Sequence, residues 1–255
     1  MKELEVKIDF LKKIKPKIFL LGVKSLYLSG KARPGQFIHL KIDSPHVFLR
    51  RPFSIHRIKG RTVYILFKVR GRGTSLLSGY KQGRVLDLIG PLGNGFGVSL
   101  KKARHNVIVG GGIGTAPLLF LAERLKGKNT SVFLGAGDKS EIVCSGEFKK
   151  LGCKVFISTE DGSLGIKGRV TDLLKSYLRT TSYEPRTDIY ACGPKAMFKS
   201  LAGIIRDKPG ITCQASFEQF MGCGTGICSA CVIKTKDGYK KVCKDGPVFD
   251  LKEIY

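Results

Sequence analysis

Hydrophobic and polar positions alternate in short segments over the first part of the chain, and turn residues separate these segments. An alternation with a period of two is typical of half-buried β-strands. Four segments show it: Glu3–Phe10, Gln36–Ile42, Thr62–Val69 and Arg84–Ile89. The pattern predicts an antiparallel β-barrel over residues 1–98.

The pattern changes after Gly90–Gly97, which is too rich in glycine and proline for a regular element and indicates a domain boundary. Short apolar runs typical of buried strands then alternate with helical patterns such as Ala116–Leu125. The runs are Asn106–Val109, Ser131–Leu134, Lys154–Ser158 and Thr187–Ala191. Strands that alternate with helices predict a doubly wound parallel α/β domain, here over residues 99–210.

The remaining residues, 211–255, are rich in glycine and cysteine and too few for an independent hydrophobic core. We therefore expect a small tail that a metal site organises. The predicted fold class is thus multi-domain: an antiparallel barrel, a parallel α/β domain and a metal-binding tail. The length of 255 residues and the hydrophobic content of 42% suit two compact domains with an appendage.

The N-terminal sequence MKELEVKIDF contains no apolar run of the kind found in signal peptides. No segment approaches the roughly 20 uninterrupted apolar residues that a membrane helix needs. We expect a cytoplasmic protein that does not enter a membrane.

The chain has 45 Lys and Arg against 20 Asp and Glu, a formal net charge of +25. Such a charge can indicate nucleic-acid binding. The basic residues are scattered from Lys2 to Lys252, however, and no nucleic-acid motif accompanies them. We therefore expect a solvated basic surface and no nucleic-acid partner, and keep a zinc-stapled nucleic-acid-binding module as a remote alternative.

Four cysteines near the C-terminus have the spacing C-x4-C-x2-C, then eleven residues and a last cysteine. This spacing is typical of plant-type [2Fe–2S] sites. Structural zinc prefers two separate C-x2-C pairs, and only one is present here. Glycines between the ligands allow a tightly wrapped loop. The cysteines are Cys223, Cys228, Cys231 and Cys243, and the glycines are Gly222, Gly224 and Gly226.

Two motifs in the predicted barrel suit a flavin nucleotide. Arg51-Pro52-Phe53-Ser54 follows a probable strand, and its arginine can grip a phosphate with two hydrogen bonds. Gly71-Arg72-Gly73-Thr74 opens a predicted helix over Thr74–Ser78, whose N-terminus suits a pyrophosphate. Taken separately, each motif also fits a capped turn or a charged hairpin.

Two motifs in the predicted α/β domain suit a dinucleotide. The segment from Gly110 to Pro117, GGGIGTAP, joins a strand to a helix and exposes backbone N–H groups to phosphate. Ala191-Cys192-Gly193-Pro194 ends the last predicted strand at the same sheet edge. There Cys192 either touches a nicotinamide ring or is a small buried cysteine.

The order of these motifs resembles the ferredoxin-reductase-like flavoprotein family, and within it the electron-transfer subunits of class B, NAD-dependent dihydroorotate dehydrogenases. The resemblance covers nearly the whole chain. The matching motifs are R-P-x-S, G-x-G-T, G-N-G-F and V-C-x-D-G-P-V-F, which stand here at Arg51–Ser54, Gly71–Thr74, Gly93–Phe96 and Val242–Phe249.

The resemblance implies three cofactor sites. FAD would be held by Arg51, Pro52, Phe53, Ser54, Leu66, Phe67, Lys68, Gly73 and Thr74. NAD(H) would contact Gly111, Gly112, Gly114, Thr115, Ala116, Pro117, Cys192, Gly193 and Pro194. The [2Fe–2S] cluster would be ligated by Cys223, Cys228, Cys231 and Cys243.

A nicotinamide exchanges two electrons at once and a [2Fe–2S] cluster exchanges one, and a flavin handles both. The resemblance therefore implies a relay from NAD(H) through FAD and the cluster to the FMN of a separate catalytic subunit. That subunit would oxidise dihydroorotate in pyrimidine biosynthesis, in a heterotetramer of two catalytic and two electron-transfer subunits. We expect no acid–base catalyst, and we expect His39, His46, His56 and His105 to be barrel or surface residues.

An alternative has the same cofactors but a different protein that exchanges electrons with the cluster. The chain would then be the flavin subunit of an NAD(P)H:ferredoxin oxidoreductase or of a hydrogenase-type complex. The sequence also leaves NAD against NADP open, because Asp138 and Lys139 offer one candidate ribose-reading residue of each kind.

Overall fold

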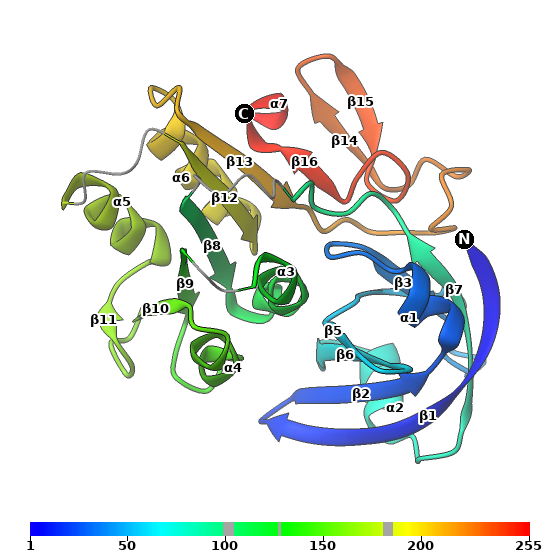
Figure 1. The fold of residues 1–255 in the computed structure, drawn as a ribbon. Helices are drawn as coiled ribbons and strands as arrows, with labels where there is room; N and C mark the ends of the chain where they lie inside the picture. The colour runs from blue at the N-terminus through cyan, green and yellow to red at the C-terminus, as the bar shows by residue number, and fades with distance from the viewer. Residues whose placement is uncertain (99–104, 127–128, 181–185) are drawn as a thin grey trace.

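A computed structural model describes residues 1–98, 105–126, 129–180 and 186–255 of the chain. Figure 1 shows an antiparallel sheet built from the N-terminal third, a parallel sheet with helices on both faces, and a C-terminal segment beside them. The predicted architecture is therefore confirmed, with differences at three places described below.

The N-terminal sheet has seven strands in the order β4-β3-β7-β1-β2-β6-β5, and every pair is antiparallel. It curls so that β4 contacts β6 and encloses a core that includes Ile8, Leu21 and Ile65. Its elements are β1 (Lys2–Lys15), β2 (Ile18–Lys24), α1 (Leu26–Lys31), β3 (Phe37–Leu40), β4 (Arg51–Ser54), β5 (Arg57–Lys59), β6 (Thr62–Lys68), α2 (Arg72–Ser78) and β7 (Val85–Leu92).

Two segments of the barrel differ from their predictions. Arg51–Ser54 forms strand β4 itself instead of following a strand, and it pairs with β3 in the register Ile38 to Phe53. Strand β7 continues through Gly90 to Leu92, where the sequence predicted an irregular segment. Glycine is suited to position 90 because a Cβ atom there would lie only 2.9 Å from Cγ2 of Ile38 on the neighbouring strand. Gly90 therefore allows β3 and β7 to pack closely.

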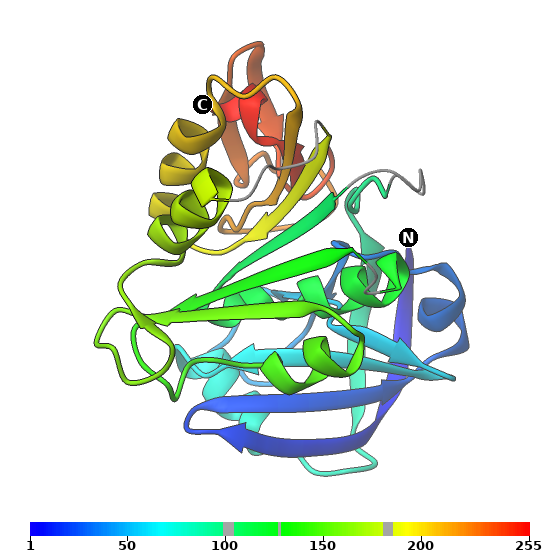
Figure 2. The same cartoon turned by 60° about the vertical axis from the view of Figure 1, so that its left-hand side comes forward.

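The second sheet has the order β11-β10-β9-β8-β12-β13-β16, and only β16 runs antiparallel to its neighbour. Helices α3 and α4 cover one face, and α5 and α6 cover the other (Figure 2). The elements are β8 (His105–Gly111), η1 (Gly112–Thr115), α3 (Leu118–Leu125), β9 (Thr130–Ala136), α4 (Ser145–Lys150), β10 (Lys154–Thr159), β11 (Ile166–Lys167), α5 (Val170–Thr180), β12 (Thr187–Cys192) and α6 (Lys195–Ile205).

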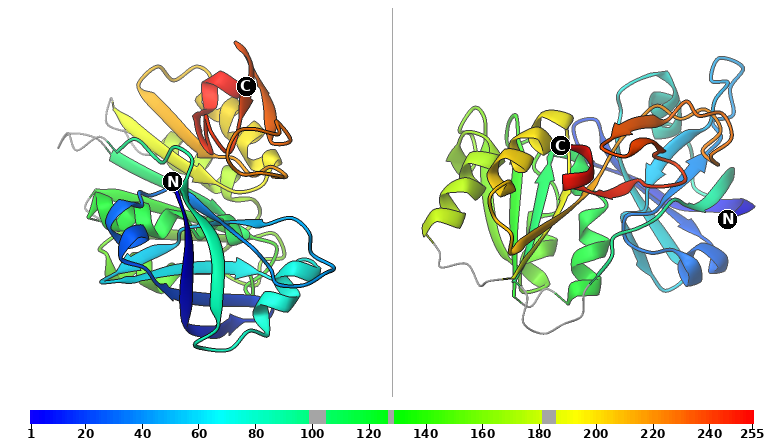
Figure 3. Two further views of the ribbon diagram at one scale, coloured as in Figure 1. Left: turned by 90° about the vertical axis from the view of Figure 1, so that its right-hand side faces the viewer. Right: turned by 90° about the horizontal axis from the view of Figure 1, so that it is seen from above.

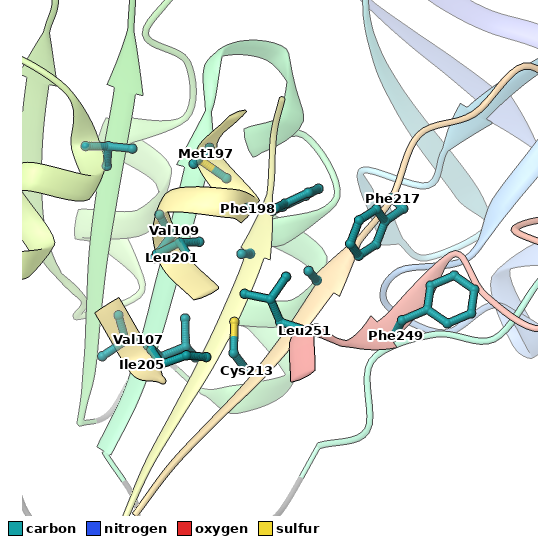
Figure 4. Close-up of a cluster of buried hydrophobic side chains, with 14 of the residues drawn as sticks. Val107, Val109, Met197, Phe198, Leu201, Ile205, Cys213, Phe217, Phe249 and Leu251 are labelled. Atoms are coloured by element: carbon teal, nitrogen blue, oxygen red, sulfur yellow. The ribbon is translucent and has the colours of Figure 1, made fainter. Parts of the chain in front are cut away.

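The sheet continues past residue 210, where the sequence predicted a domain boundary. Strands β13 (Ile211–Ser216) and β16 (Val248–Asp250) form its edge, and the hairpin β14 (Val232–Thr235) to β15 (Gly238–Lys241) and helix α7 (Leu251–Ile254) complete the C-terminal segment. This segment packs on the sheet through apolar side chains (Figure 4). The ring centroids of Phe198 and Phe217 are 4.6 Å apart. The tail therefore has apolar support in addition to any metal.

Polar contacts join the barrel to the α/β domain, and three of them come from the segment between β4 and the end of β6. His56, which follows β4, places Nδ1 2.6 Å from the carbonyl oxygen of Ala116. Arg57 pairs with Glu123, and Lys68 pairs with Glu141. Ala116 and Glu141 follow β8 and β9, so this side of the barrel faces the carboxyl edge of the parallel sheet, and Glu123 places Arg57 against helix α3. A further contact, from Nζ of Lys15 at the end of β1 to the carbonyl oxygen of Lys139, measures 2.9 Å.

The buried His56 predicts a pH-dependent stability. Burial lowers its pKa to about 4, although the Ala116 carbonyl acts in the opposite direction; the nearby charges of Arg57 and Glu147 have smaller, opposing effects. Between about pH 6.5 and pH 4, His56 is therefore protonated in the unfolded chain but neutral in the folded chain. The free energy of unfolding falls over this range by about 1.4 kcal/mol per pH unit for this one group.

Urea unfolding at pH 7 and at pH 5 measures this effect. We expect the wild-type chain to lose more stability on acidification than His56→Asn. Equal losses in the two proteins would contradict the assignment to His56.

Candidate functional site

A cavity of about 510 Å³ lies between the barrel and the segment that follows β13. Strands β4 and β6 supply one wall, and the start of α3 supplies another. The predicted FAD residues on its lining are Pro52, Phe53, Ser54, Leu66, Phe67, Lys68 and Thr74. We call this space the flavin cavity.

Two predicted FAD residues, Arg51 and Gly73, do not line this cavity and lie next to each other. A Cβ atom on Gly73 would lie 3.3 Å from Nε of Arg51, so the arginine packs closely on the first turn of α2. Oγ1 of Thr74 accepts hydrogen bonds from the backbone N–H groups of Arg70, at 2.9 Å, and Gly71. These contacts fix the turn that the sequence predicts for a pyrophosphate.

A second cavity, of about 390 Å³, lies at the carboxyl edge of the parallel sheet. The turns after β8, β9 and β12 line it with Gly111, Gly112, Gly114, Gly135, Gly137, Gly193 and Pro194. A Cβ atom on Gly114 would lie 2.7 Å from the Cys192 carbonyl oxygen, so glycine lets the two turns meet. Open α/β sheets bind nucleotides at such an edge, and we call this space the dinucleotide cavity.

The flavin cavity and the dinucleotide cavity share part of their lining: Lys68, Arg70, Ile113, Gly114 and Glu218. The Lys68–Glu141 ion pair crosses this shared region from the barrel to the α/β domain. Two ligands that filled the cavities would therefore meet at this wall.

Four predicted dinucleotide residues lie elsewhere than in the dinucleotide cavity. Ala116 and Pro117 line the flavin cavity. Thr115 and Cys192 line neither cavity, and their side chains are 2% and 3% exposed. Burial raises the pKa of the Cys192 thiol far above its usual range. The side chain of Cys192 thus has the surroundings of a small core residue.

Sequence reasoning missed the segment that joins strand β13 to the first cluster cysteine. Its residues Phe217, Glu218, Gln219, Phe220 and Met221 all line the flavin cavity. No motif marks these residues. However, the segment follows a strand and ends two residues before Cys223, and this position could have indicated a place beside the cofactors. Glu160 and Arg169, which line the dinucleotide cavity, carry no such signal.

The four cluster cysteines form two pairs. Backbone N–H groups of Cys228 and Thr225 donate to Sγ of Cys223, each at 3.4 Å, and the Cys223 N–H donates to Sγ of Cys228 at 3.4 Å. In the second pair the Cys243 N–H donates to Sγ of Cys231 at 3.4 Å. The first pair lies on the loop between β13 and β14, and the second is held by the hairpin.

The two pairs differ in burial and in protonation. Cys231 and Cys243 are 2% and 3% exposed, whereas Cys228 is exposed. Burial opposes ionisation of Cys223, but the N–H donors of Cys228 and Thr225 outweigh it and lower its pKa to about 5. Burial raises the pKa of Cys243 to about 12. Thiolates are the ligand form, and N–H donors to sulfur support it at Cys223.

This arrangement fits two irons better than one metal ion. Structural zinc needs four ligands around one centre, whereas a [2Fe–2S] cluster places two cysteines on each iron. Two separate cysteine pairs match the second case.

Comparison with protein families supports the cluster site and the dinucleotide site. The model of the iron-sulfur cluster binding domain of dihydroorotate dehydrogenase B matches residues 218–255. The model of the oxidoreductase NAD-binding domain matches residues 108–202.

Curated relatives match along the whole chain. The dihydroorotate dehydrogenase B (NAD(+)) electron transfer subunit of Geobacillus sp. strain WCH70 is 39% identical over 263 residues, which cover 100% of this chain and 99% of the relative. The subunit of the same name from Caldanaerobacter subterraneus is 39% identical over 88% of this chain and 87% of its own. The chain belongs to this family.

Solved structures agree at the level of the fold. A structure of the NADH-dependent reduced ferredoxin-NADP oxidoreductase superposes with a TM-score of 0.85, at 30% identity, and covers 98% of this chain and 89% of its own. A ferredoxin NADP+ reductase from Neisseria gonorrhoeae with bound FAD and NADP gives a TM-score of 0.70 at 20% identity, over 85% of this chain and 100% of its own.

Membership of the family confirms the predicted function, that of an oxidoreductase electron-transfer subunit of the NAD-dependent dihydroorotate dehydrogenase type. The two family models confirm the iron–sulfur and NAD-binding parts of the predicted cofactor set. The zinc-stapled nucleic-acid-binding alternative is therefore dropped. No helix of the described residues is long and apolar enough to cross a membrane.

The paired cysteines predict a selective loss in Cys228→Ala. Removing one thiolate breaks the exposed pair, so we expect iron to fall from about two atoms per chain to almost none. Flavin should remain bound, because Cys228 does not line the flavin cavity. Iron analysis and the visible spectrum measure both.

The matched control is Cys153→Ala, which removes a buried thiol of the α/β domain. This variant should keep both cofactors. Full iron content in Cys228→Ala would show that Cys228 is not a ligand.

Proposed function

We propose that this chain passes electrons between NAD(H) and an FMN-containing dihydroorotate dehydrogenase catalytic subunit, through FAD in the flavin cavity and a [2Fe–2S] cluster on the four cysteines. The predicted division would assign FAD to residues 1–98, NAD(H) to residues 99–210 and the cluster to residues 211–255. The chain would work in the cytoplasm as part of a heterotetramer of two catalytic and two electron-transfer subunits.

The observation that supports this proposal is that the dinucleotide cavity, the flavin cavity and the cluster cysteines adjoin one another in that order. The flavin cavity shares Lys68, Arg70, Ile113, Gly114 and Glu218 with the dinucleotide cavity. On its other side, the lining residue Met221 is two residues from Cys223. FAD placed there would adjoin both of its electron partners, which a relay requires.

The chain's own residues bind and orient in this scheme. Arg51 and the turn from Gly73 to Thr74 would hold the FAD pyrophosphate, and β4 and β6 would hold its ring. Backbone N–H groups of Gly111, Gly112 and Gly114 would face the dinucleotide phosphates. Bound FAD supplies the exchange between electron pairs and single electrons. Hydride exchange needs no general base, so none is assigned.

The surface around the exposed Cys228 would contact the catalytic subunit. Cys228 is exposed, and its neighbour Ile227 is an apolar side chain with 83% exposure. An exposed apolar side chain beside an electron-exit site suits a protein interface. Such a contact would also exclude water from the cluster.

A second candidate keeps the same relay. The likeness to the NADH-dependent reduced ferredoxin-NADP oxidoreductase structure, at a TM-score of 0.85, favours a ferredoxin-linked client. The dihydroorotate dehydrogenase family model over the cluster segment favours the first candidate. Mixing the chain with a dihydroorotate dehydrogenase catalytic subunit distinguishes them, because only the first predicts reduction of NAD+ by dihydroorotate.

The relay itself is tested by an anaerobic visible spectrum of the purified chain before and after NADH. We expect flavin and cluster absorption, about two irons per chain and bleaching of both chromophores by NADH. A colourless protein, or a flavin that NADH does not bleach, would refute the proposal.

The partner surface predicts that Ile227→Lys weakens the complex with the catalytic subunit by about tenfold or more, because a charge would be buried in an apolar contact. Affinity is measured by titration of one subunit with the other. The control Ile166→Lys places the same change at another exposed isoleucine, on β11 at the opposite edge of the sheet. Equal affinities for the two variants would rule out this interface.

A further inference from the structure

Strand β3 of the barrel carries a buried histidine that contacts a cluster ligand. The side chain of His39 is 0% exposed, and Nδ1 lies 3.2 Å from the carbonyl oxygen of Cys223, 184 residues further along the chain. A carbonyl oxygen can only accept, so Nδ1 is the nitrogen that carries the proton. This hydrogen bond links the barrel directly to the cluster loop.

The loop is shaped around this imidazole ring. A Cβ atom on Gly224 would lie 2.4 Å from Nδ1 of His39, so no larger residue fits there without displacement. Gly224 also has φ +73°, a conformation that favours glycine. Two independent features of Gly224, its contact and its backbone angle, therefore adapt the cluster loop to His39.

The same strand reaches the flavin cavity. Phe37 lines that cavity and stands opposite Ser54 of β4, and His39 stands opposite Pro52. Residues two apart in a strand point to the same face. Phe37 and His39 thus place the flavin cavity and the cluster loop against one face of one four-residue strand.

Other contacts from the barrel hold the end of the cluster segment, at residues 244–246, but not the loop at residues 222–228. Asn94 hydrogen-bonds the backbone of Lys244, Asp245 and Gly246, next to Cys243. Both views of Figure 3 show the C-terminal segment, in orange and red, reaching over the barrel. Among the described side chains of the barrel, only His39 forms a hydrogen bond to the backbone of residues 222–228.

We propose that His39 is a positioning residue for electron transfer: its hydrogen bond to Cys223 fixes the first cluster ligand beside the flavin cavity and thereby sets the rate of electron exchange between flavin and cluster. This inference rests on the proposed function. It assigns His39 to the step between flavin and cluster, and not to the step between NADH and flavin.

His56 provides an internal comparison. It is the other buried barrel histidine, and its Nδ1 also bonds a backbone carbonyl, that of Ala116 at 2.6 Å. Ala116 lines the flavin cavity, so His56 supports the wall of that cavity that the α/β domain supplies. Equivalent changes at the two histidines should therefore affect different steps.

The experiment follows both steps after NADH is mixed with the anaerobic full-length chain, loaded with FAD and iron. Visible absorbance reports flavin reduction, and electron paramagnetic resonance of frozen samples reports cluster reduction. The variants are His39→Leu, which removes the donor, and His39→Asn, whose side-chain N–H₂ can stand near the position of Nδ1. His46→Leu, at an exposed histidine, is the surface control.

We expect His39→Leu to reduce its flavin at the wild-type rate and its cluster about 10- to 100-fold more slowly, the range that follows loss of an outer hydrogen bond at a metal site. His39→Asn should recover most of the cluster rate. His56→Leu should alter flavin reduction instead. Loss of iron from His39→Leu, with iron kept in His39→Asn, would equally support a role in holding the loop.

Two results would overturn the inference. One is wild-type cluster reduction in an iron-loaded His39→Leu chain. The other is an equal defect in His39→Leu and His39→Asn, which would assign the effect to ring packing and not to the hydrogen bond. A wild-type chain without a cluster, or with a cluster that NADH cannot reduce, would instead refute the proposed function.

Discussion

The contact between strands β4 to β6 of the barrel and the carboxyl edge of the parallel sheet determines where the flavin cavity and the dinucleotide cavity can lie. Neither domain encloses the flavin cavity alone: the barrel supplies Ser54 and Lys68, and the α/β domain supplies Gly114 and Pro117. The buried His56–Ala116 hydrogen bond and two ion pairs hold this contact. A rigid interface is required, because electron transfer and hydride exchange both depend on fixed separations.

Close approach between segments limits the residues that the chain can use at two turns beside the sites. At Gly114 the turn after β8 meets the carbonyl of Cys192, and at Gly224 the cluster loop meets His39. In both places a side chain would displace one wall of a site. Gly114 therefore spaces two turns within the α/β domain, and Gly224 spaces the cluster loop from the barrel.

The regular strands and the cysteine spacing were predictable because local patterns determine them. Alternation located β1 and β6, and the apolar runs located β8 and β12. Strand β4 was missed because arginine, proline and serine hide its pairing with β3, which only the folded sheet reveals. The extension of the sheet by β13 and β16 was missed because the nearby cysteines pointed to a separate tail.

The site shows the same division. The motifs and the family resemblance located about half of the lining of the flavin cavity and a smaller part of the lining of the dinucleotide cavity, since glycine turns and the R-P-F-S segment are local signals. They could not locate the segment from Phe217 to Met221, which lines the flavin cavity through tertiary packing of Phe217 on Phe198. Nor could they pair His39 with Cys223, because no local pattern relates residues 184 positions apart.

The asymmetry of the cysteine pairs follows from their support. Cys231 and Cys243 belong to the apolar core that packs the hairpin on the parallel sheet, so their positions are set by burial. Cys223 and Cys228 lie on a glycine-rich loop that has little core beneath it, and their positions depend on hydrogen bonds. The loop pair is also the pair that His39 contacts, and it includes the exposed Cys228. Electrons would therefore enter from the flavin and leave to a partner at the Cys223–Cys228 side of the cluster site, which the apolar core does not hold. A fixed contact such as the hydrogen bond of His39 has most effect at that side.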